Sequence, residues 1–448
     1  MTIQNDTIAA IATPSGMGGV GVIRVSGSKA YEIAKKITGK ELIPRYAHYA
    51  NFTDNSTDGL SNTDKVIDQG LVIYFKAPHS YTGEDIVEFQ GHGGVYVLQS
   101  VLKLILANGA RQARPGEFTE RAFLNDKMDL VQAEAVADLI ESRSQSATTA
   151  ALRSLSGQFS AVIDNLQASI ISLRVYVEAA LDFSEEEIDF LSDGKVEGQI
   201  TDLQNKVAET LKKAGYGKLL HDGVQVVLVG EPNVGKSSLM NQLLGQDRAI
   251  VTDEAGTTRD TLEETILIQH IPVKITDTAG LREADNIVEK VGIERAKAAV
   301  QSSDLAIWLR DGRMLTDNRP TELDSIDFLE VHNKIDLCTD TNNSTDKAIR
   351  ISAKTGQGID RLINQIADKV IGKHSEEGVF SARERHIAAL QQAQEHINTA
   401  HRCIQNLATA ELVAEELRLA QNALSEITGE YRSDDLLGAI FSSFCVGK

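Results

Sequence analysis

Apolar residues recur along this chain with two different periods, and the period changes near residue 121. Before that point, short runs of apolar and β-branched residues predict strands at residues 7–12, 20–25, 70–75 and 85–89. Val95, Leu98, Leu102 and Ile105 then recur at helical spacing. The polar stretch 51–64 indicates an exposed loop. Residues 1–120 are therefore expected to form a mixed domain of helices and strands.

Three- and four-residue steps between apolar positions predict helices in two separate blocks. The first block covers residues 121–215 and the second covers residues 377–448. Neither block looks complete alone, so we expect them to pack together as one discontinuous helical domain, with residues 216–376 inserted as a separate domain. Insertion is tolerated where the two ends of the inserted domain lie close together. The glycine-bearing segments 213–218 and 372–378 mark the two expected junctions.

The inserted segment opens with a phosphate-binding pattern. The apolar run Val224–Val229 predicts a strand, and Gly230–Ser237 then has the spacing G-x-x-x-x-G-K-S of a phosphate-binding loop. Glycines let backbone N–H groups wrap a phosphate, and the helix that follows adds a favourable dipole. Lys236 would reach the outer phosphates, and the Ser237 hydroxyl would ligate Mg²⁺.

Four further segments follow in the order that a guanine-nucleotide site needs. Gly256–Asp260 offers hydroxyls to the γ-phosphate and Mg²⁺, and Asp277–Gly280 offers a carboxylate near the metal and a glycine that can sense the γ-phosphate. The aspartate of Asn333–Asp336 can accept two hydrogen bonds from the N1–H and 2-amino edge of guanine, and Ser352–Lys354 would back the base. Each tetrapeptide alone fits an ordinary turn, but five segments in register predict a GTP site. The expected GTP-binding residues are Asn233, Val234, Gly235, Lys236, Ser237, Ser238, Thr252, Asp253, Glu254, Ala255, Gly256, Thr257, Thr258, Asp277, Thr278, Ala279, Gly280, Asn333, Lys334, Asp336, Ser352, Ala353 and Lys354.

The sequence lacks the usual residue that orients the attacking water. Many small GTPases carry a glutamine just after D-x-x-G, and here that position is Leu281. A substitute polar group is needed, and the acidic stretch Glu283–Glu289 is near in sequence, although a solvated loop charge is the commoner role of such carboxylates. Arg259 is a candidate charge stabiliser, and an exposed arginine is again the commoner outcome. Asn233 and residues 252–257 could instead offer oxygens to a monovalent cation that acts in place of an arginine finger.

Composition limits the class of protein further. The formal net charge is −19, so any contact with RNA must use local basic patches or a partner protein. Cys338, Cys403 and Cys445 are widely spaced, which argues against a zinc site or a disulfide framework and fits a reducing compartment. Without a signal-peptide pattern or a long uncharged apolar run, the sequence predicts a cytoplasmic protein without a membrane segment.

Motifs outside the nucleotide site carry a family resemblance. The chain ends with the pattern C-x-G-K, and matching segments are Gly18–Gly27, Tyr81–Asp85, Gly91–Gly94, Arg114–Phe118, Arg121–Lys127 and Phe444–Lys448. On these segments the sequence resembles the MnmE (TrmE) family of tRNA-modification GTPases over essentially its whole length. The resemblance implies an N-terminal α+β domain that binds a reduced folate and forms a homodimer, the discontinuous helical domain, and an inserted Ras-like P-loop GTPase domain.

The resemblance also implies roles for single residues. Arg24, Glu84, Lys127 and Lys448 would contact 5,10-methylenetetrahydrofolate or 5-formyltetrahydrofolate. The K⁺ ligands would be Asn233, Thr252, Glu254 (through its carbonyl) and Thr257, the Mg²⁺ ligands would be Ser237 and Thr258, and Glu289 would position water. The nucleotide domains of the dimer would meet when GTP and K⁺ are present. With an FAD- and NADH-dependent partner of the MnmG (GidA) type, in a heterotetramer or larger complex, the family adds an aminomethyl or carboxymethylaminomethyl group to C5 of the tRNA wobble uridine. Methylenetetrahydrofolate supplies the carbon.

Cys445 and the overall function each leave alternatives open. Lys448 could lower the pKa of the Cys445 thiol and make it reactive near the folate, but a terminal cysteine is more often inert. A GTPase that assembles ribosomes shares the nucleotide motifs without needing a folate-type domain or the C-terminal motif. A folate-dependent aminomethyl-transfer enzyme regulated by a GTP module would need neither tRNA nor a flavoprotein.

Overall fold

The computed structural model describes residues 6–14, 16–54, 65–182, 195–245, 263–277, 298–314, 319–338, 348–372, 378–405, 410–430 and 434–447. These residues divide into two compact units. The first unit joins residues 1–137 to residues 425–448, and the second comprises residues 138–424. The first unit is therefore built from both ends of the sequence.

A six-stranded sheet with the order β3-β4-β5-β2-β1-β6 forms the N-terminal part of the first unit. The strands and helices of this part are β1 (Ile8–Ile11), β2 (Gly18–Ser26), α1 (Ala30–Thr38), β3 (Ala47–Asp54), β4 (Lys65–Phe75), β5 (Ile86–Gly93), α2 (Val95–Ala107) and β6 (Arg111–Gln112). Every pairing is antiparallel except that of β1 with β6. Ile33 of α1, Ile105 of α2 and Phe89 of β5 belong to one buried cluster, so both helices share a core with the sheet.

The predicted loop at residues 51–64 is wrong for its first four residues, and the rest of it lies outside the described residues. Residues 51–54 continue β3 and pair with β4, from Asn51 opposite Gln69 to Asp54 opposite Lys65. Phe52 is buried in the core while the other side chains of this end are polar. The end of this edge strand has polar residues on one face and only one buried side chain, that of Phe52, on the other. Such a composition is also typical of a loop, which explains the wrong prediction.

Helices complete the first unit. They are α3 (Glu117–Leu124), the first turns of α4 (Leu130–Glu141), the last turn of α12 (Ala410–Thr428) and α13 (Asp434–Ser442). Phe123 and Leu130 are buried in one cluster with Phe441 and Phe444. After α13, Val446 forms an antiparallel bridge with Pro115, and the Gly116 N–H donates to the Cys445 carbonyl at 3.3 Å. The segment that carries the C-terminal motif is thus fastened to the N-terminal part of the chain.

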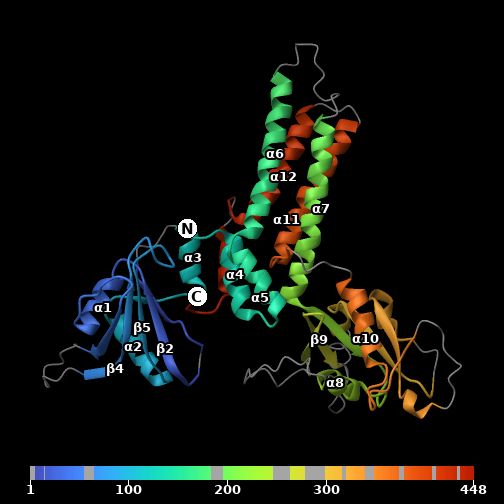
Figure 1. Cartoon of the computed structure of the whole chain (residues 1–448), viewed down its shortest axis with the longest axis horizontal. Coiled ribbons are helices and arrows are strands. Elements are labelled where there is room, and N and C mark those ends of the chain that lie inside the picture. The colour runs from blue at the N-terminus through green and yellow to red at the C-terminus, as the bar shows by residue number, and fades with distance from the viewer. Residues whose placement is uncertain are drawn as a thin grey trace. The chain divides into compact units, whose positions relative to one another are not determined.

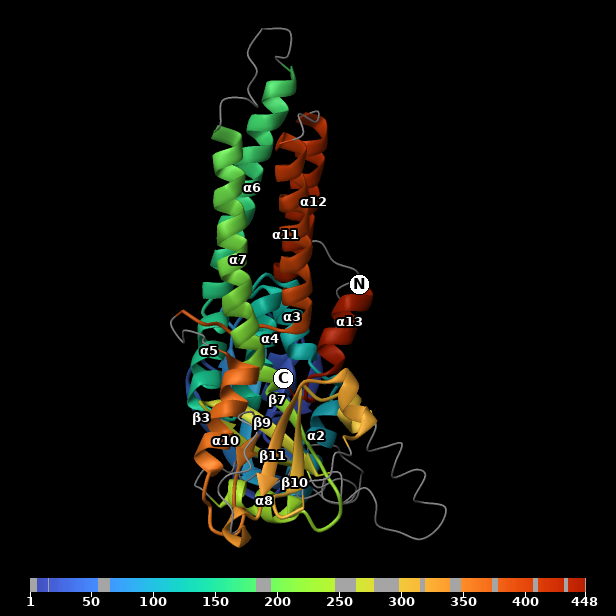
Figure 2. The same ribbon diagram turned by 90° about the vertical axis from the view of Figure 1, so that its right-hand side faces the viewer.

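Long helices from both predicted helical blocks lie side by side in the second unit (Figures 1 and 2). They are α6 (Gln158–Asp182), α7 (Lys195–Asp222), α11 (Glu384–Gln405) and α12, whose last turn belongs to the first unit. The shorter α5 (Gln145–Leu155) contacts α6 and α7. The Arg174 guanidinium donates to Gln421 Oε1 at 2.7 Å, and the Gln204 amide donates to Asn398 Oδ1 at 2.7 Å. These contacts join residues that precede the nucleotide domain to residues that follow it.

The inserted domain contains a second six-stranded sheet, with the order β12-β11-β10-β7-β9-β8. Its elements are β7 (Val224–Val229), α8 (Lys236–Leu244), β8 (Glu263–Ile268), β9 (Ile271–Asp277), β10 (Leu305–Asp311), η2 (Thr321–Ser325), β11 (Phe328–Asn333), η3 (Ile335–Leu337), β12 (Ile349–Arg350), α10 (Ile359–Ile366) and the π-helical η4 (Ala367–Ile371). All neighbours pair in parallel except β8 with β9. In such a sheet, ligands bind beyond the carboxyl ends of the strands.

One buried carboxylate is shared by the two connections to the nucleotide domain. Asp138 of α4 is 6% exposed, and it accepts hydrogen bonds from Ser381 Oγ and from Arg383 at 2.6 Å. His221 Nε2, near the end of α7, lies 3.0 Å from the same carboxylate. The expected boundary at residue 216 falls inside α7, which continues to Asp222. Both connections are therefore held at one point of the helical part.

Among the described residues, no helix is long and apolar enough to cross a membrane.

Candidate nucleotide-binding site

The phosphate-binding loop turns tightly between β7 and α8. Gly235 has a φ of +101°, and a Cβ placed there would lie 2.3 Å from Asn333 Nδ2. A Cβ on Gly230 would lie 2.3 Å from the Leu309 carbonyl oxygen. Both glycines are therefore required by close approach of neighbouring groups, and the first also by its left-handed backbone. Ser237 and Ser238 lie in the first turn of α8, where backbone N–H groups attract anions.

Lys236 is held across the loop from which it comes. Its side chain is 6% exposed in the folded chain, and Nζ donates to the carbonyl oxygens of Gly230 at 2.9 Å and Glu231 at 3.1 Å. These acceptors bring a positive charge over the loop that the sequence predicts to bind phosphates. The arrangement suits an ammonium that contacts the outer phosphates of a nucleotide.

A hydroxyl and a carboxylate meet beside the loop. Ser237 Oγ donates to Asp277 Oδ2 at 3.3 Å, and Asp277 is 3% exposed at the end of β9. Asp277 lies opposite Leu228 in the β7–β9 pairing, so the end of β9 lies beside the end of β7, from which the loop leads to Ser237 in α8. Hydroxyl and carboxylate oxygens are the ligands that Mg²⁺ prefers. These two residues thus fit the Mg²⁺ role that the sequence suggests.

Asn333 ties three loops of the site together. Its Nδ2 donates to the Val234 carbonyl at 2.9 Å, and its Oδ1 accepts from the Ala353 N–H at 2.9 Å. Asn333 is 2% exposed, so both bonds lie away from water. The side chain therefore fixes the phosphate-binding loop relative to the loop at Ser352–Lys354.

The residues expected to read the base lie next to this bridge. Lys334 adopts a φ of +65°, and its Nζ donates to the Asn233 carbonyl at 2.6 Å and to Asp311 Oδ2 at 2.8 Å. Ser352 Oγ donates to Asp336 Oδ1 at 2.6 Å, which orients the carboxylate expected to read guanine. Lys354 is exposed beside it. All the expected residues of this region are brought to one edge of the sheet.

Asp311 is a site residue that the sequence reasoning missed. It follows the apolar run Leu305–Leu309, which is not among the predicted strands and which forms β10. Hydrogen bonds from Arg313 and Lys334 hold the pKa of the Asp311 carboxyl well below its usual range. The sequence signal that could have identified Asp311 is therefore an apolar run followed closely by an aspartate.

The expected folate-binding residues lie in the first unit on neighbouring segments. Arg24 Nε donates to Glu88 Oε1 at 3.0 Å, and its guanidinium lies 5.3 Å from the centre of the Tyr81 ring. Glu84 Oε2 accepts from Ser26 Oγ at 2.7 Å, and Ser26 is two positions from Arg24 on β2. Lys127 Nζ donates to the Pro78 carbonyl at 3.0 Å. The loop of residues 78–85 thus carries Glu84 and contacts both Arg24, through Tyr81, and Lys127, through Pro78.

Two protein-family models match this chain and together cover most of it. Residues 130–445 match the model described as MnmE helical domain, and residues 7–127 match the model described as GTP-binding protein TrmE N-terminus. The chain belongs to the MnmE family. The resemblance inferred from the motifs is confirmed, as is the multidomain architecture.

Relatives from the MnmE family match along their full length. A protein named tRNA modification GTPase MnmE from Dichelobacter nodosus is 51% identical over 458 residues, with 100% of both chains covered. Proteins of the same name are 52% identical over 456 residues in Dechloromonas aromatica and 48% identical over 462 residues in Photobacterium profundum, again with 100% of both chains covered.

Part of the expected MnmE-family site lies outside the described residues. These positions are Thr252, Asp253, Glu254, Ala255, Gly256, Thr257, Thr258, Arg259, Thr278, Ala279, Gly280, Glu289 and Lys448. Leu281, at the place of the usual glutamine, also lies outside them. Of the four expected K⁺ ligands, only Asn233 is described; it is exposed at the loop with a φ of +63°. Cys445 is exposed. Within the described ranges, no group of three or more His, Cys, Asp or Glu side chains is placed to hold a metal ion.

Proposed function

We propose that this chain hydrolyses GTP and couples the hydrolysis to modification of the wobble uridine of tRNA. The observation that carries the proposal is the Asn333 bridge between the phosphate-binding loop and the base-reading loop. The bridge supports the proposal because it joins the loop that carries Lys236 to the loop whose Ser352 binds Asp336. The relatives that match the chain over its whole length are named tRNA modification GTPases.

The described residues divide the work on GTP between recognition and charge neutralisation. The Asp336 carboxylate, oriented by Ser352, accepts from the N1–H and 2-amino groups of guanine. Lys236 and the N-terminus of α8 neutralise the phosphates. Ser237 and Asp277 would hold Mg²⁺, which would supply positive charge at the β- and γ-phosphate oxygens. For the attacking water, we keep Glu289 as the candidate positioning group and Arg259 as a candidate charge stabiliser.

The dimer, the partner protein, the folate and the K⁺ ion are proposed from the resemblance to the MnmE family. The chain would act as a homodimer with an FAD- and NADH-dependent partner, and a reduced folate held by Arg24, Glu84, Lys127 and Lys448 would supply the carbon. K⁺ would bind beside the phosphates. GTP hydrolysis should then fall when Na⁺ replaces K⁺ at matched ionic strength, and equal rates in the two salts would remove the cation from the proposal.

Nucleoside analysis of total tRNA from a deletion strain tests the coupled function. We expect the C5 substituent of the wobble uridine to disappear, and to return with the wild-type chain but not with Lys236→Ala. Unchanged tRNA together with a defect in ribosome assembly would favour an assembly GTPase. Unchanged tRNA with a defect in folate-dependent aminomethyl transfer would favour the GTP-regulated folate enzyme.

A further inference from the structure

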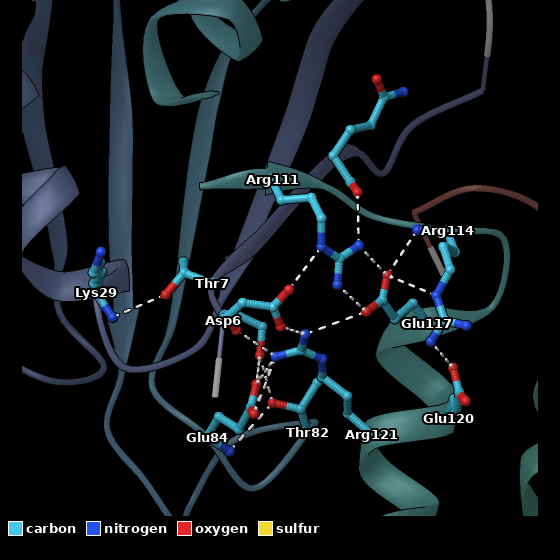
Figure 3. Close-up of polar contacts among 12 residues, drawn as sticks. Asp6, Thr7, Lys29, Thr82, Glu84, Arg111, Arg114, Glu117, Glu120 and Arg121 are labelled. Atoms are coloured by element: carbon cyan, nitrogen blue, oxygen red, sulfur yellow. Dashed lines mark hydrogen bonds and ion pairs between the residues drawn. The ribbon is translucent and has the colours of Figure 1, made fainter. Parts of the chain in front are cut away.

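A dense network of charged side chains includes Glu84, one of the expected folate-binding residues (Figure 3). At its centre is Arg121 of α3, which is 7% exposed. One guanidinium nitrogen, NH1, donates to both carboxylate oxygens of Glu84, at 3.2 and 3.1 Å, and to the Asp6 carbonyl at 2.8 Å. The other nitrogen, NH2, donates to Asp6 Oδ1 at 2.7 Å and to Glu117 Oε1 at 3.2 Å. A single buried arginine therefore joins Glu84 to the start of β1 and to its own helix.

Glu84 is held from two sides by these contacts. Arg121 NH1 lies within hydrogen-bonding distance of both carboxylate oxygens, and Ser26 Oγ donates to Oε2 at 2.7 Å. Ser26 is fixed in turn by a contact of 2.7 Å with the Thr82 hydroxyl. The Glu84 side chain is still 19% exposed. It is thus a carboxylate with a set orientation and an accessible edge, which is what a site needs to accept hydrogen bonds from a ligand.

Arg121 is itself fixed from the side away from Glu84. Arg111 donates to Glu117 Oε1 at 2.7 Å and to Asp6 Oδ2 at 2.7 Å, so it grips the same two carboxylates as Arg121. Burial raises the pKa of Glu117, but hydrogen bonds from Arg111 and the Arg114 N–H outweigh burial and hold the pKa at about 2. Glu117 is therefore ionised at neutral pH and continues to orient Arg121.

An arginine suits position 121 because its two terminal nitrogens donate hydrogen bonds to different carboxylates. The planar guanidinium presents NH1 to Glu84 and NH2 to Asp6 and Glu117 in one rigid group. A lysine carries a single ammonium and cannot reproduce both edges. The position thus demands the geometry of arginine in addition to its charge.

We propose that Arg121 is a positioning residue of the folate site, which holds the Glu84 carboxylate in the orientation that accepts hydrogen bonds from the ring N–H and amino edge of a reduced pterin. This inference rests on the proposed role of Glu84 in folate binding. Arg121 acts through Glu84 and has no ligand contact of its own in the proposal.

Binding of 5-formyltetrahydrofolate, measured by calorimetry on the full-length chain, tests the inference. Arg121→Gln should weaken binding by about 10- to 100-fold, the value of hydrogen bonds to a charged group. The matched control is Arg114→Gln, which removes the hydrogen bond from Arg114 NH2 to Glu120 at 2.9 Å and leaves the contacts of Arg121 with Glu84 and Asp6 in place. The control should change affinity by about threefold or less. Equal losses in the two variants would overturn the proposal in favour of a general structural role.

A double-variant cycle separates this inference from the proposed function. If Arg121 acts through Glu84, then Arg121→Gln combined with Glu84→Gln should bind no more weakly than Glu84→Gln alone. Additive losses would overturn the positioning role. Unchanged binding in Glu84→Gln alone would instead refute the folate role of Glu84 and, with it, the inference.

Folding of the variants is checked by GTP hydrolysis without tRNA, which depends on the nucleotide domain, and by circular dichroism. If Arg121→Gln does not fold, Arg121→Lys keeps the charge and enters the same cycle. We expect Arg121→Lys to lose part of the affinity and again to have no effect once Glu84 is replaced. Full affinity in Arg121→Lys would show that charge alone suffices and would overturn the geometric argument.

Discussion

The cluster at Asp138 predicts that stability depends on pH through His221. Hydrogen bonds from the imidazole to Asp138 and then to Asp222 raise the pKa of His221 from 6.5 to about 9. A histidine whose folded pKa is raised stabilises the fold fully below its unfolded pKa, and this contribution is lost as the pH rises through the folded value. The relevant window therefore runs from pH 6.5 to about 9.

The size of the effect follows from the same values. A rise from 6.5 to about 9, at about 1.4 kcal/mol per pKa unit, corresponds to about 3.5 kcal/mol. The His221 side chain is 22% exposed, so solvent screening reduces this to about 2–3 kcal/mol. We therefore expect wild type to exceed His221→Gln in free energy of unfolding by about 2–3 kcal/mol in mild acid and by nearly nothing well above pH 9.

Urea denaturation across this pH range measures the difference. Circular dichroism follows the helices, while the emission of Trp308, the single tryptophan, reports the nucleotide domain separately. His270→Gln, at an exposed turn between β8 and β9, controls for loss of a histidine elsewhere. A difference between wild type and His221→Gln that stays constant from mild acid to strong base would refute the reasoning.

Four further outcomes are expected. Asp336→Asn should exchange preference for GTP with preference for XTP, because an amide donates to the 2-oxo group of xanthine; competition between the two nucleotides measures this, and retained GTP preference contradicts it. Asn333→Ala should raise the Kd for GTP about 10- to 100-fold, since the Val234 carbonyl loses its buried partner; a fluorescent GTP analogue reports the change, and unaltered affinity would show that the bridge is dispensable. Glu289→Ala should lower kcat strongly at nearly constant nucleotide affinity, and a parallel loss of affinity would indicate a structural residue. Cys445→Ser should leave GTP hydrolysis intact while abolishing or sharply reducing tRNA modification, because serine cannot supply a thiolate; full modification would make the cysteine structural.

The nucleotide-site motifs and the long helices could be predicted from short stretches of sequence. The phosphate-binding loop, Asp277 and Asn333 each follow or end a buried strand, so a parallel sheet brings them to the same edge. All three belong to the segments from which the sequence predicts one GTP site. The helical block expected at residues 377–448 contains α11 and α12, as its three- and four-residue apolar spacing predicts. A strong period and a motif directly after a strand need no knowledge of distant residues.

Interactions between distant segments were not predictable. Arg121 meets Asp6 and Glu84 only because β1, the 78–85 loop and α3 converge in the folded unit. No spacing in the sequence marks those contacts. Asp138 likewise has the appearance of an ordinary helix residue until His221 and Arg383 are brought to it.

The discontinuity of the first unit has a consequence during protein synthesis. Phe123 and Leu130 emerge from the ribosome long before Phe441 and Phe444, which bury them in the finished fold. The intervening unit, residues 138–424, is made first, and at elongation rates of about 5–20 residues per second its synthesis takes on the order of 15–60 s. Throughout that time the nascent chain presents an apolar surface that waits for α13 to cover it. A chaperone that binds exposed apolar surfaces could therefore bind here during synthesis. A product truncated before α13 keeps this apolar surface exposed permanently.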